Sequence, residues 1–156
     1  MAKILFVCLA NICRSPLAEG IAKDINEKRK LDFSIDSAGL SGHHAGEHPC
    51  EDSRIIALMN KIDISQYRSR QVTSADKEVF DYVVAMDASN KQRLEALGFK
   101  NVYLLGDFNH YRGADVPDPY FFDEFDDRIR NAYRMIDRCV RDFIRKIEKN
   151  RLTSSA

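Results

Sequence analysis

Short continuous runs of apolar residues, a pattern typical of buried parallel strands, recur along the chain. Three runs are clear, at residues 4–7, 82–86 and 102–105, and a weaker fourth lies at residues 33–38. The three clear runs are shorter than a stable helix and contain only apolar and aromatic residues. We therefore expect a sheet of about four strands that is covered on both faces.

Between these runs the apolar residues are spaced three and four positions apart, as in amphipathic helices. The first such segment is predicted to have Ser15 as its N-cap and Pro16 as its first helical residue. Further helices are predicted at residues 51–60 and 90–97, and the longest at about residues 123–151. The apolar stripe of the longest helix consists of Phe125, Ile129, Ala132, Ile136, Cys139, Phe143 and Ile147.

Strand and helix alternate from the first residues onward, which favours an α/β fold: a doubly wound parallel sheet with helices on both faces. We expect a single domain over residues 1–156, with a flexible tail at about residues 152–156. Residues 106–120 show no clear periodicity, and loops of this length in compact domains are usually functional. Ligands bind beyond the carboxyl ends of the strands in such folds, and Cys8 follows the first strand directly.

Charge and hydropathy exclude several classes of partner. The 156 residues include 24 Lys plus Arg and 24 Asp plus Glu. This balance removes any global attraction to nucleic acid or to an anionic membrane surface. No apolar run approaches the roughly 18 residues of a membrane span, and the N-terminus resembles no targeting segment. We therefore expect a cytoplasmic protein, a monomer or weak dimer, that neither binds nucleic acid nor inserts into membranes.

The four cysteines are expected to be reduced thiols, because structural disulfides are rare in the cytoplasm. Cys139 lies on the apolar stripe of the longest helix and is expected to pack in the core, whereas Cys50, in a loop, is expected to be a bystander. Together with Cys50, residues His43, His44 and His48 match no established zinc spacing, so neither a metal nor another cofactor is expected.

The segment at residues 7–16, Val-Cys-Leu-Ala-Asn-Ile-Cys-Arg-Ser-Pro, runs from a strand end through a short loop into a helix start. This is the layout of an anion cradle, in which backbone N–H groups, a helix N-terminus and Arg14 can all face one oxyanion. The glycines and the lysine of a nucleotide P-loop are missing. A thiol, that of Cys8, takes their place. The surrounding groups favour its thiolate form, which indicates a nucleophile, and the Ser15 hydroxyl can donate to its sulfur.

At these residues the chain resembles the low-molecular-weight protein tyrosine phosphatases, whose signature is Cys-x5-Arg-Ser just after the first strand. The resemblance covers essentially the whole chain and includes Ser37-Ala38-Gly39, Ala85-Met86-Asp87 and Asp118-Pro119-Tyr120. It implies metal-independent hydrolysis of phosphotyrosine and small aryl phosphates through a phosphocysteine. The implied partners are phosphotyrosine-containing proteins.

The resemblance assigns a role to each site residue. Cys8 is the nucleophile, Arg14 holds the phosphate, and Asp118 acts as general acid and then as general base. Asn11 is assigned a strained turn conformation that holds the loop, which suits a residue that tolerates positive φ. The residues expected to bind or support the phosphate are Leu9, Ala10, Asn11, Ile12, Cys13, Ser15 and Ser37.

Two further assignments also rest on the resemblance. Tyr120 and Phe121 are expected to form one wall of a slot for an aryl ring, with Ile12 in the other wall. Cys13 is expected to be a redox partner that forms a reversible disulfide with Cys8 under oxidant.

The chain departs from the family pattern at three positions. Ala10 stands where Gly is more usual, and its methyl group is expected to affect the cradle. Tyr67 stands where relatives often carry a His that supports the serine after the arginine. Phe121 stands where many members have a second Tyr, which leaves Tyr120 as the candidate for phosphorylation in that pair.

Two acidic residues leave alternatives open. Asp115 competes with Asp118 as the acid, and the Pro119-Tyr120 context favours Asp118. Asp87 either only caps the helix after the third strand or also supports the active-site mouth.

Three other functions are compatible with this fold. An arsenate reductase needs further cysteines close together, and Cys50 and Cys139 are distant in sequence. Protein arginine phosphatases tend to carry Thr where this chain has Ile12, and the apolar residue favours an aryl substrate. A non-catalytic phosphotyrosine-binding module is expected to lack Cys8 or Asp118, and both are present.

Overall fold

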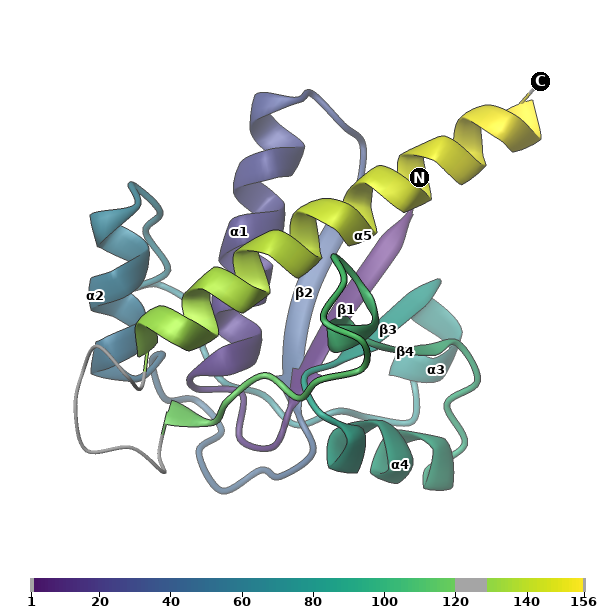
Figure 1. Cartoon of the computed structure of the whole chain (residues 1–156). Coiled ribbons are helices and arrows are strands. Elements are labelled where there is room, and N and C mark those ends of the chain that lie inside the picture. Colours follow the sequence, from purple (N-terminus) through teal and green to yellow (C-terminus); the bar gives the residue numbers. More distant parts are fainter. Residues whose placement is uncertain (1, 120–128, 156) are drawn as a thin grey trace.

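The computed structural model describes residues 2–119 and 129–155, with side chains to residue 150. A parallel sheet with the strand order β2-β1-β3-β4 forms its centre (Figure 1). The strands are β1 (Lys3–Cys8), β2 (Ser34–Gly39), β3 (Tyr82–Ala85) and β4 (Val102–Leu104). The four apolar runs are therefore strands, and the predicted parallel sheet is confirmed.

The helices of the described residues correspond to the predicted segments, together with short elements that were not predicted. Those predicted are α1 (Arg14–Lys28), α2 (Glu51–Met59), α4 (Ala88–Ala96) and α5 (Asn131–Ser155). The additional elements are α3 (Asp76–Val79) and a single 3₁₀ turn, η1 (Leu105–Asp107), which are too short to produce a helical pattern.

The longest helix, α5, differs from its prediction at the end that the structure describes. It continues to Ser155, so residues 152–155, predicted as a flexible tail, continue the helix. Its predicted start near residue 123 lies outside the described residues. No helix within residues 2–119 and 129–155 is both long and apolar enough to cross a membrane.

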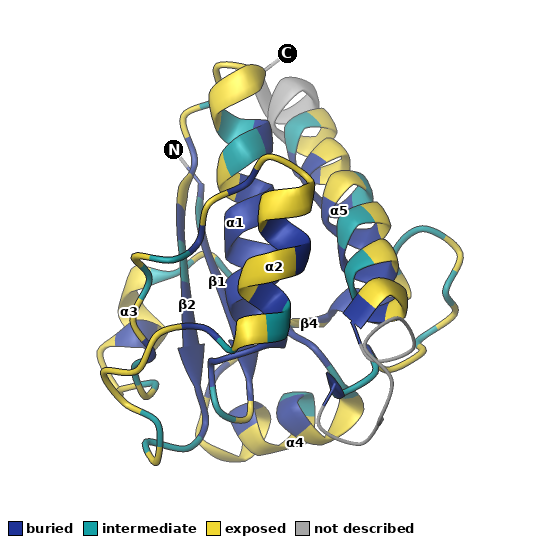
Figure 2. Cartoon of the chain, turned by 90° about the vertical axis from the view of Figure 1, so that its left-hand side faces the viewer, coloured by how far each residue is buried: buried dark blue, intermediate teal, exposed yellow. Residues whose placement is uncertain are grey.

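Alternate residues of β1 point into two separate cores. Ile4 and Phe6 pack with α1 and α5, where Phe143 meets Phe6 edge to face. Leu5 and Val7 pack on the opposite face, with Leu94 of α4 among others. Figure 2 shows α1 largely buried, with α2 and α5 beside it. Helices therefore cover both faces of the sheet, as predicted, and the sheet and helices together bury the strand that leads to Cys8.

The start of α1 is two residues earlier than predicted. Its N-cap is Cys13, whose side chain makes no capping hydrogen bond, and Arg14 is the first helical residue. Ser15 is therefore not the N-cap. Its hydroxyl instead makes hydrogen bonds with Cys8 and Asn11, in the loop that precedes the helix. Pro16 lies within the first turn, where a helix needs no N–H donor.

The loop after η1 returns to the carboxyl edge of the sheet. The N–H of Val116 donates to the carbonyl of Met86, just after β3, at 2.9 Å. Gly106 lies so close to the backbone of Ala114 that an added Cβ would overlap its carbonyl. This close approach bends the segment back and brings Asp118 to the end of β1.

Candidate active site

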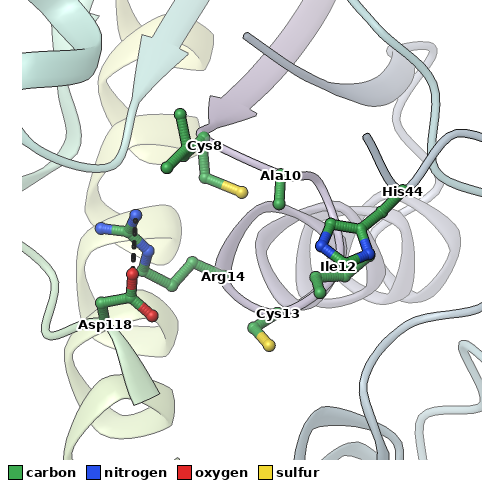
Figure 3. Close-up of a pocket in the computed structure, with 8 residues that line it drawn as sticks. Cys8, Ala10, Ile12, Cys13, Arg14, His44 and Asp118 are labelled. Atoms are coloured by element: carbon green, nitrogen blue, oxygen red, sulfur yellow. Dashed lines mark ion pairs between the residues drawn. The ribbon is translucent and has the colours of Figure 1, made fainter. Parts of the chain in front are cut away.

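A pocket of about 280 Å³ lies at the carboxyl end of β1 (Figure 3). It brings together the nucleophile, the phosphate-holding arginine and the acid that the sequence predicted, namely Cys8, Arg14 and Asp118. The loop between β1 and α1 forms most of its floor and one wall. The complete lining consists of Cys8, Leu9, Ala10, Ile12, Cys13, Arg14, His44 and Asp118.

The Cys8 sulfur lies at the base of the loop and is almost fully buried. The backbone N–H of Asn11 donates to Cys8 Sγ at 3.2 Å. The Ser15 hydroxyl lies 3.0 Å from the same sulfur. Since Ser15 Oγ accepts a hydrogen bond from the Asn11 amide, its own proton is free to donate to a thiolate. Both contacts therefore stabilise negative charge on Cys8.

Asn11 holds the loop in the conformation that the resemblance implied. Its φ is 60°, in the left-handed region. Its side-chain Nδ2 donates to Ser15 Oγ at 2.8 Å and to Ser37 Oγ at 2.9 Å. Its Oδ1 accepts from the backbone N–H of Arg70 at 3.0 Å. Three hydrogen bonds thus compensate the cost of about 1–3 kcal/mol of the strained backbone.

A buried carboxylate that the sequence analysis missed completes this network. Ser37 Oγ donates to Glu19 Oε1 at 2.6 Å, and Lys23 pairs with Glu19 at 2.6 Å. Burial raises the pKa of Glu19, and the hydrogen bonds from Lys23 and Ser37 oppose that rise. A series of hydrogen bonds therefore leads from Glu19 through Ser37, Asn11 and Ser15 to Cys8. This series fixes the direction in which each donor points. The signal that could have identified Glu19 in the sequence is its position as an acidic residue on the buried half of the first helix.

Arg14 is held beside the sulfur by groups from two other segments. Its Nη1 donates to Asp87 Oδ2 at 2.8 Å and to the Val116 carbonyl at 3.2 Å, and the residue is only 4% exposed. Its Nη2 lies 3.8 Å from Asp118 Oδ2. The guanidinium is thus oriented in the pocket before any ligand binds.

These contacts bear on the two alternatives that the acidic residues leave open. Asp87 has both roles, because its Oδ1 accepts from the N–H of Asn90 as the N-cap of α4 while its Oδ2 binds Arg14. Asp115 instead accepts from the N–H of Ala88 at the start of α4. Asp118 is the one of the competing pair that lines the pocket.

The walls of the pocket are mostly apolar. Ile12 and Ala10 form one side, and Leu9, with 43% of its surface exposed, lies at the mouth. His44 contributes the polar part of the wall, and its Nδ1 lies 2.6 Å from Glu47 Oε2. In the sequence, His44 is a candidate only as a metal ligand. Tyr120 and Phe121, predicted as the opposite wall, lie outside the described residues.

Tyr67, one of the departures from the family pattern, packs near α1. Among the contacts of the described residues, none joins Tyr67 to Ser15. The Lys23 ammonium lies 4.7 Å from its ring centroid. Burial, aided by the charge of Glu19, raises the pKa of the Tyr67 hydroxyl above its ordinary value. Ser15 is oriented by Asn11 instead.

Cys13 has a different partner from the one expected. It forms a disulfide with Cys50, with the two Cα atoms 5.4 Å apart, while Cys8 is a free thiol. The expectation of four reduced thiols and of a bystander role for Cys50 is therefore wrong for this pair. The two residues are 37 positions apart, and they meet because the N–H of Cys50 donates to the Ile12 carbonyl at 2.7 Å. Cys139 is fully buried in the core, as predicted.

The chain matches a known protein family over nearly its whole length. Residues 3–153 match the family model of the low molecular weight phosphotyrosine protein phosphatases. The low molecular weight protein-tyrosine-phosphatase YfkJ of Bacillus subtilis is 42% identical over 134 residues, which cover 81% of this chain and 86% of the relative.

Solved structures give the same result. The crystal structure of Bacillus subtilis YfkJ superposes with a TM-score of 0.88 at 34% identity, over 96% of both chains. That of a Drosophila arginine phosphatase superposes with a TM-score of 0.85 at 31% identity, over 93% of this chain and 97% of the other. Since the family match spans nearly the whole sequence, this chain belongs to the low molecular weight phosphotyrosine protein phosphatase family.

Proposed function

We propose that the protein hydrolyses phosphotyrosine in proteins, and small aryl phosphates, through a phosphocysteine at Cys8. The observation that carries this proposal is the placement of Cys8, Arg14 and Asp118 around one pocket whose mostly apolar walls suit an aryl phosphate. No step requires a metal ion, because the loop N–H groups and Arg14 supply the charge that the equatorial oxygens need.

In the first step the Cys8 thiolate attacks phosphorus in line with the departing oxygen. The Arg14 guanidinium binds two equatorial oxygens, so the phosphate competes for the cation that lies 3.8 Å from Asp118. Asp118, acting as the neutral carboxylic acid, donates its proton to the leaving phenolic oxygen. The phosphorus–oxygen bond breaks as the phosphorus–sulfur bond forms.

In the second step water replaces the thiolate. Asp118, now ionised, removes a proton from the attacking water, and the phosphorus–sulfur bond breaks. The electron pair returns to Cys8, where the Asn11 N–H and the Ser15 hydroxyl stabilise it. The network behind the loop thus serves the sulfur both as nucleophile and as leaving group.

The choice between aryl and arginine phosphates depends on the walls of the pocket. Ile12 and Leu9 offer apolar surface to a flat ring and no partner for a guanidinium. The likeness to a Drosophila arginine phosphatase makes phosphoarginine the substrate to compare. We expect the apolar wall to favour the aryl substrate.

The test measures hydrolysis of a phosphotyrosine peptide, a phosphoarginine peptide and p-nitrophenyl phosphate in the presence of a chelator. The proposal expects turnover of both aryl substrates, competitive inhibition by vanadate and a lower kcat/KM for phosphoarginine. Turnover of phosphoarginine alone would favour an arginine phosphatase. Arsenate reduction coupled to a dithiol, without phosphatase activity, would favour a reductase.

The cellular setting stays a prediction. The balanced charge of the chain and its lack of a long apolar segment favour a cytoplasmic enzyme. The family resemblance implies phosphotyrosine proteins as substrates, and a monomer or weak dimer is expected. Cell fractionation and light scattering measure both properties.

Alkylation should distinguish the reactive thiol from the inert one. Treating the protein with iodoacetate near neutral pH is expected to modify Cys8 and abolish activity, because its sulfur lies in an anion-binding loop and accepts a hydrogen bond from the Asn11 N–H. Burial raises the pKa of Cys139 to about 12, so that thiol stays unmodified. Inorganic phosphate should protect Cys8. Peptide mapping by mass spectrometry provides the measurement, and equal labelling of both residues would contradict the assignment.

Replacing Gly39 should disturb the loop without touching a catalytic atom. Gly39 ends β2, and an added Cβ would lie 2.9 Å from the carbonyl carbon of Ala10 and from the carbonyl oxygen of Leu9. Because both are backbone atoms, the loop must shift. Gly39→Ala is expected to lower kcat/KM by about 10- to 100-fold and the free energy of unfolding by about 1–3 kcal/mol.

Gly42→Ala is the matched control for this change. Its added Cβ meets the end of the Gln71 side chain, which can rotate away. Kinetics and urea denaturation measure both variants. Equal kcat/KM values for the two would show that Gly39 does not position the loop.

A further inference from the structure

Cys13 and Cys50 occupy equivalent positions at the starts of two helices. Cys13 is the N-cap of α1 and Cys50 the N-cap of α2, and neither side chain caps its helix. They form a disulfide with a Cα separation of 5.4 Å, which is within the usual range. A helix N-terminus favours a thiolate, so each cysteine in its reduced form is suited to thiol–disulfide exchange.

The two cysteines are held together by more than the sulfur–sulfur bond. The N–H of Cys50 donates to the Ile12 carbonyl at 2.7 Å, and Ser53 Oγ donates to the Cys13 carbonyl at 2.9 Å. These hydrogen bonds join the start of α2 to the catalytic loop. Because they involve no sulfur, they keep Cys50 beside Cys13 after the disulfide is reduced, at a high effective concentration.

Cys13 also lines the same pocket as the nucleophile. Both Cys13 and Cys8 line the catalytic pocket, on the two ends of the same loop (Figure 3). Cys50 instead borders a second groove of about 450 Å³, formed with residues that include His44, His48 and Arg54. Cys13 therefore lies between a buried catalytic thiol and a thiol that a reductant can reach from outside the pocket.

We propose that Cys50 restores the oxidised nucleophile by displacing Cys8 from a disulfide with Cys13. This inference rests on the proposed role of Cys8. A peroxide oxidises the Cys8 thiolate to a sulfenic acid and is itself reduced, with release of hydroxide. The Cys13 thiol attacks the Cys8 sulfur, and a Cys8–Cys13 disulfide forms with loss of water. The Cys50 thiolate, whose proton passes to solvent and neutralises the hydroxide, then attacks Cys13 Sγ.

In this exchange the Cys13–Cys50 bond forms, the Cys8–Cys13 bond breaks, and the electron pair remains on Cys8 as thiolate. Overall, the thiols of Cys13 and Cys50 reduce one peroxide to two waters. A dithiol reductant then returns the Cys13–Cys50 disulfide to two thiols through the second groove. The enzyme is thereby active again before that reduction takes place.

The contacts of Cys8 give this exchange its direction. A thiol that is stabilised as an anion is a good leaving group. The Asn11 N–H and the Ser15 hydroxyl stabilise Cys8 in this way. A Cys8–Cys13 disulfide forgoes that stabilisation, whereas the Cys13–Cys50 disulfide retains it. We therefore expect the disulfide to accumulate at Cys13–Cys50.

The experiment compares wild type, Cys50→Ser and Cys50→Ala, with Cys139→Ala as the matched control that removes a thiol outside the relay. Each reduced protein receives equimolar hydrogen peroxide, and samples are taken over time. Free thiols are then alkylated, disulfides are mapped by mass spectrometry, and aryl phosphatase activity is measured without added reductant.

Wild type and Cys139→Ala are expected first to lose activity and then to recover it as the Cys13–Cys50 disulfide replaces the Cys8–Cys13 disulfide. After the exchange, the Cys13–Cys50 disulfide should exceed the Cys8–Cys13 disulfide about tenfold or more. Both Cys50 variants should start with wild-type activity, accumulate Cys8–Cys13 and recover only with dithiothreitol. Persistence of Cys8–Cys13 in wild type, or equally fast recovery in the Cys50 variants, would overturn the proposal.

A Cys8→Ser variant tests the order of the steps. Without the peroxide-reactive thiolate, the Cys13–Cys50 disulfide should form at least about tenfold more slowly. An unchanged rate would mean that this pair is oxidised directly, which overturns the relay. The disulfide map is independent of activity, so a failure of the proposed function appears as absent turnover in the untreated protein, and a failure of the relay appears in the map alone.

Discussion

A Cys8→Ser protein should hydrolyse aryl phosphates roughly 10⁴-fold more slowly than wild type, or slower still. A hydroxyl holds its proton far more tightly than a thiol does and is a far weaker nucleophile near neutral pH. The substitution preserves the shape of the loop, because serine can take the place of the sulfur beside Asn11 and Ser15. Phosphate and vanadate should therefore still bind through Arg14.

The measurement combines steady-state kinetics with rapid quenching. Wild type mixed with excess substrate and quenched in acid should yield a peptide phosphorylated at Cys8, and the variant should yield none. Cys50→Ser is the matched control, since it makes the same substitution outside the catalytic pocket and should retain activity under reducing conditions. If Cys8→Ser hydrolyses substrate at the wild-type rate, the nucleophile is another group.

The sheet and its main helices were predictable because each follows from a local pattern. The strand that precedes Cys8 is a continuous apolar run, and Leu17 and Ile21 give α1 its periodicity. The nine-residue helices α2 and α4 were predicted within two residues of their ends. By contrast, α3 has only four residues, which is too few for a period of 3.6 to be visible.

The candidate site was predictable where its residues are adjacent in sequence. Cys8, Arg14 and Ser15 fall within one loop and helix start, so their spacing alone indicates an anion cradle. The contacts that support this loop come from distant segments. Glu19 reaches Cys8 only through Ser37 on another strand, and Cys50 reaches Cys13 through a loop whose path has no periodic pattern. Such contacts depend on tertiary packing and leave no local signal.

Replacing Asp118 should slow the chemical step while substrate binding is retained. Asp118→Ala is expected to lower kcat by roughly 10² to 10⁴ for a phosphotyrosine peptide, because the phenolate must then leave without a proton. KM should stay equal or fall, since the Arg14 guanidinium loses a competing carboxylate 3.8 Å away and can bind phosphate more freely. A variant that binds its substrate but turns it over slowly is also a tool to capture phosphoproteins from a lysate.

The leaving group and a neighbouring acidic residue provide the controls for this prediction. p-Nitrophenolate leaves without help far more readily than an unsubstituted phenolate, so the variant should lose less activity on p-nitrophenyl phosphate than on phenyl phosphate. Asp115→Ala removes a carboxylate from the same loop that instead accepts from the N–H of Ala88. It should lower the free energy of unfolding by about 1 kcal/mol and leave kcat nearly unchanged. Equal losses for both leaving groups would place the general acid elsewhere, because only a proton donor acts selectively on the poorer leaving group.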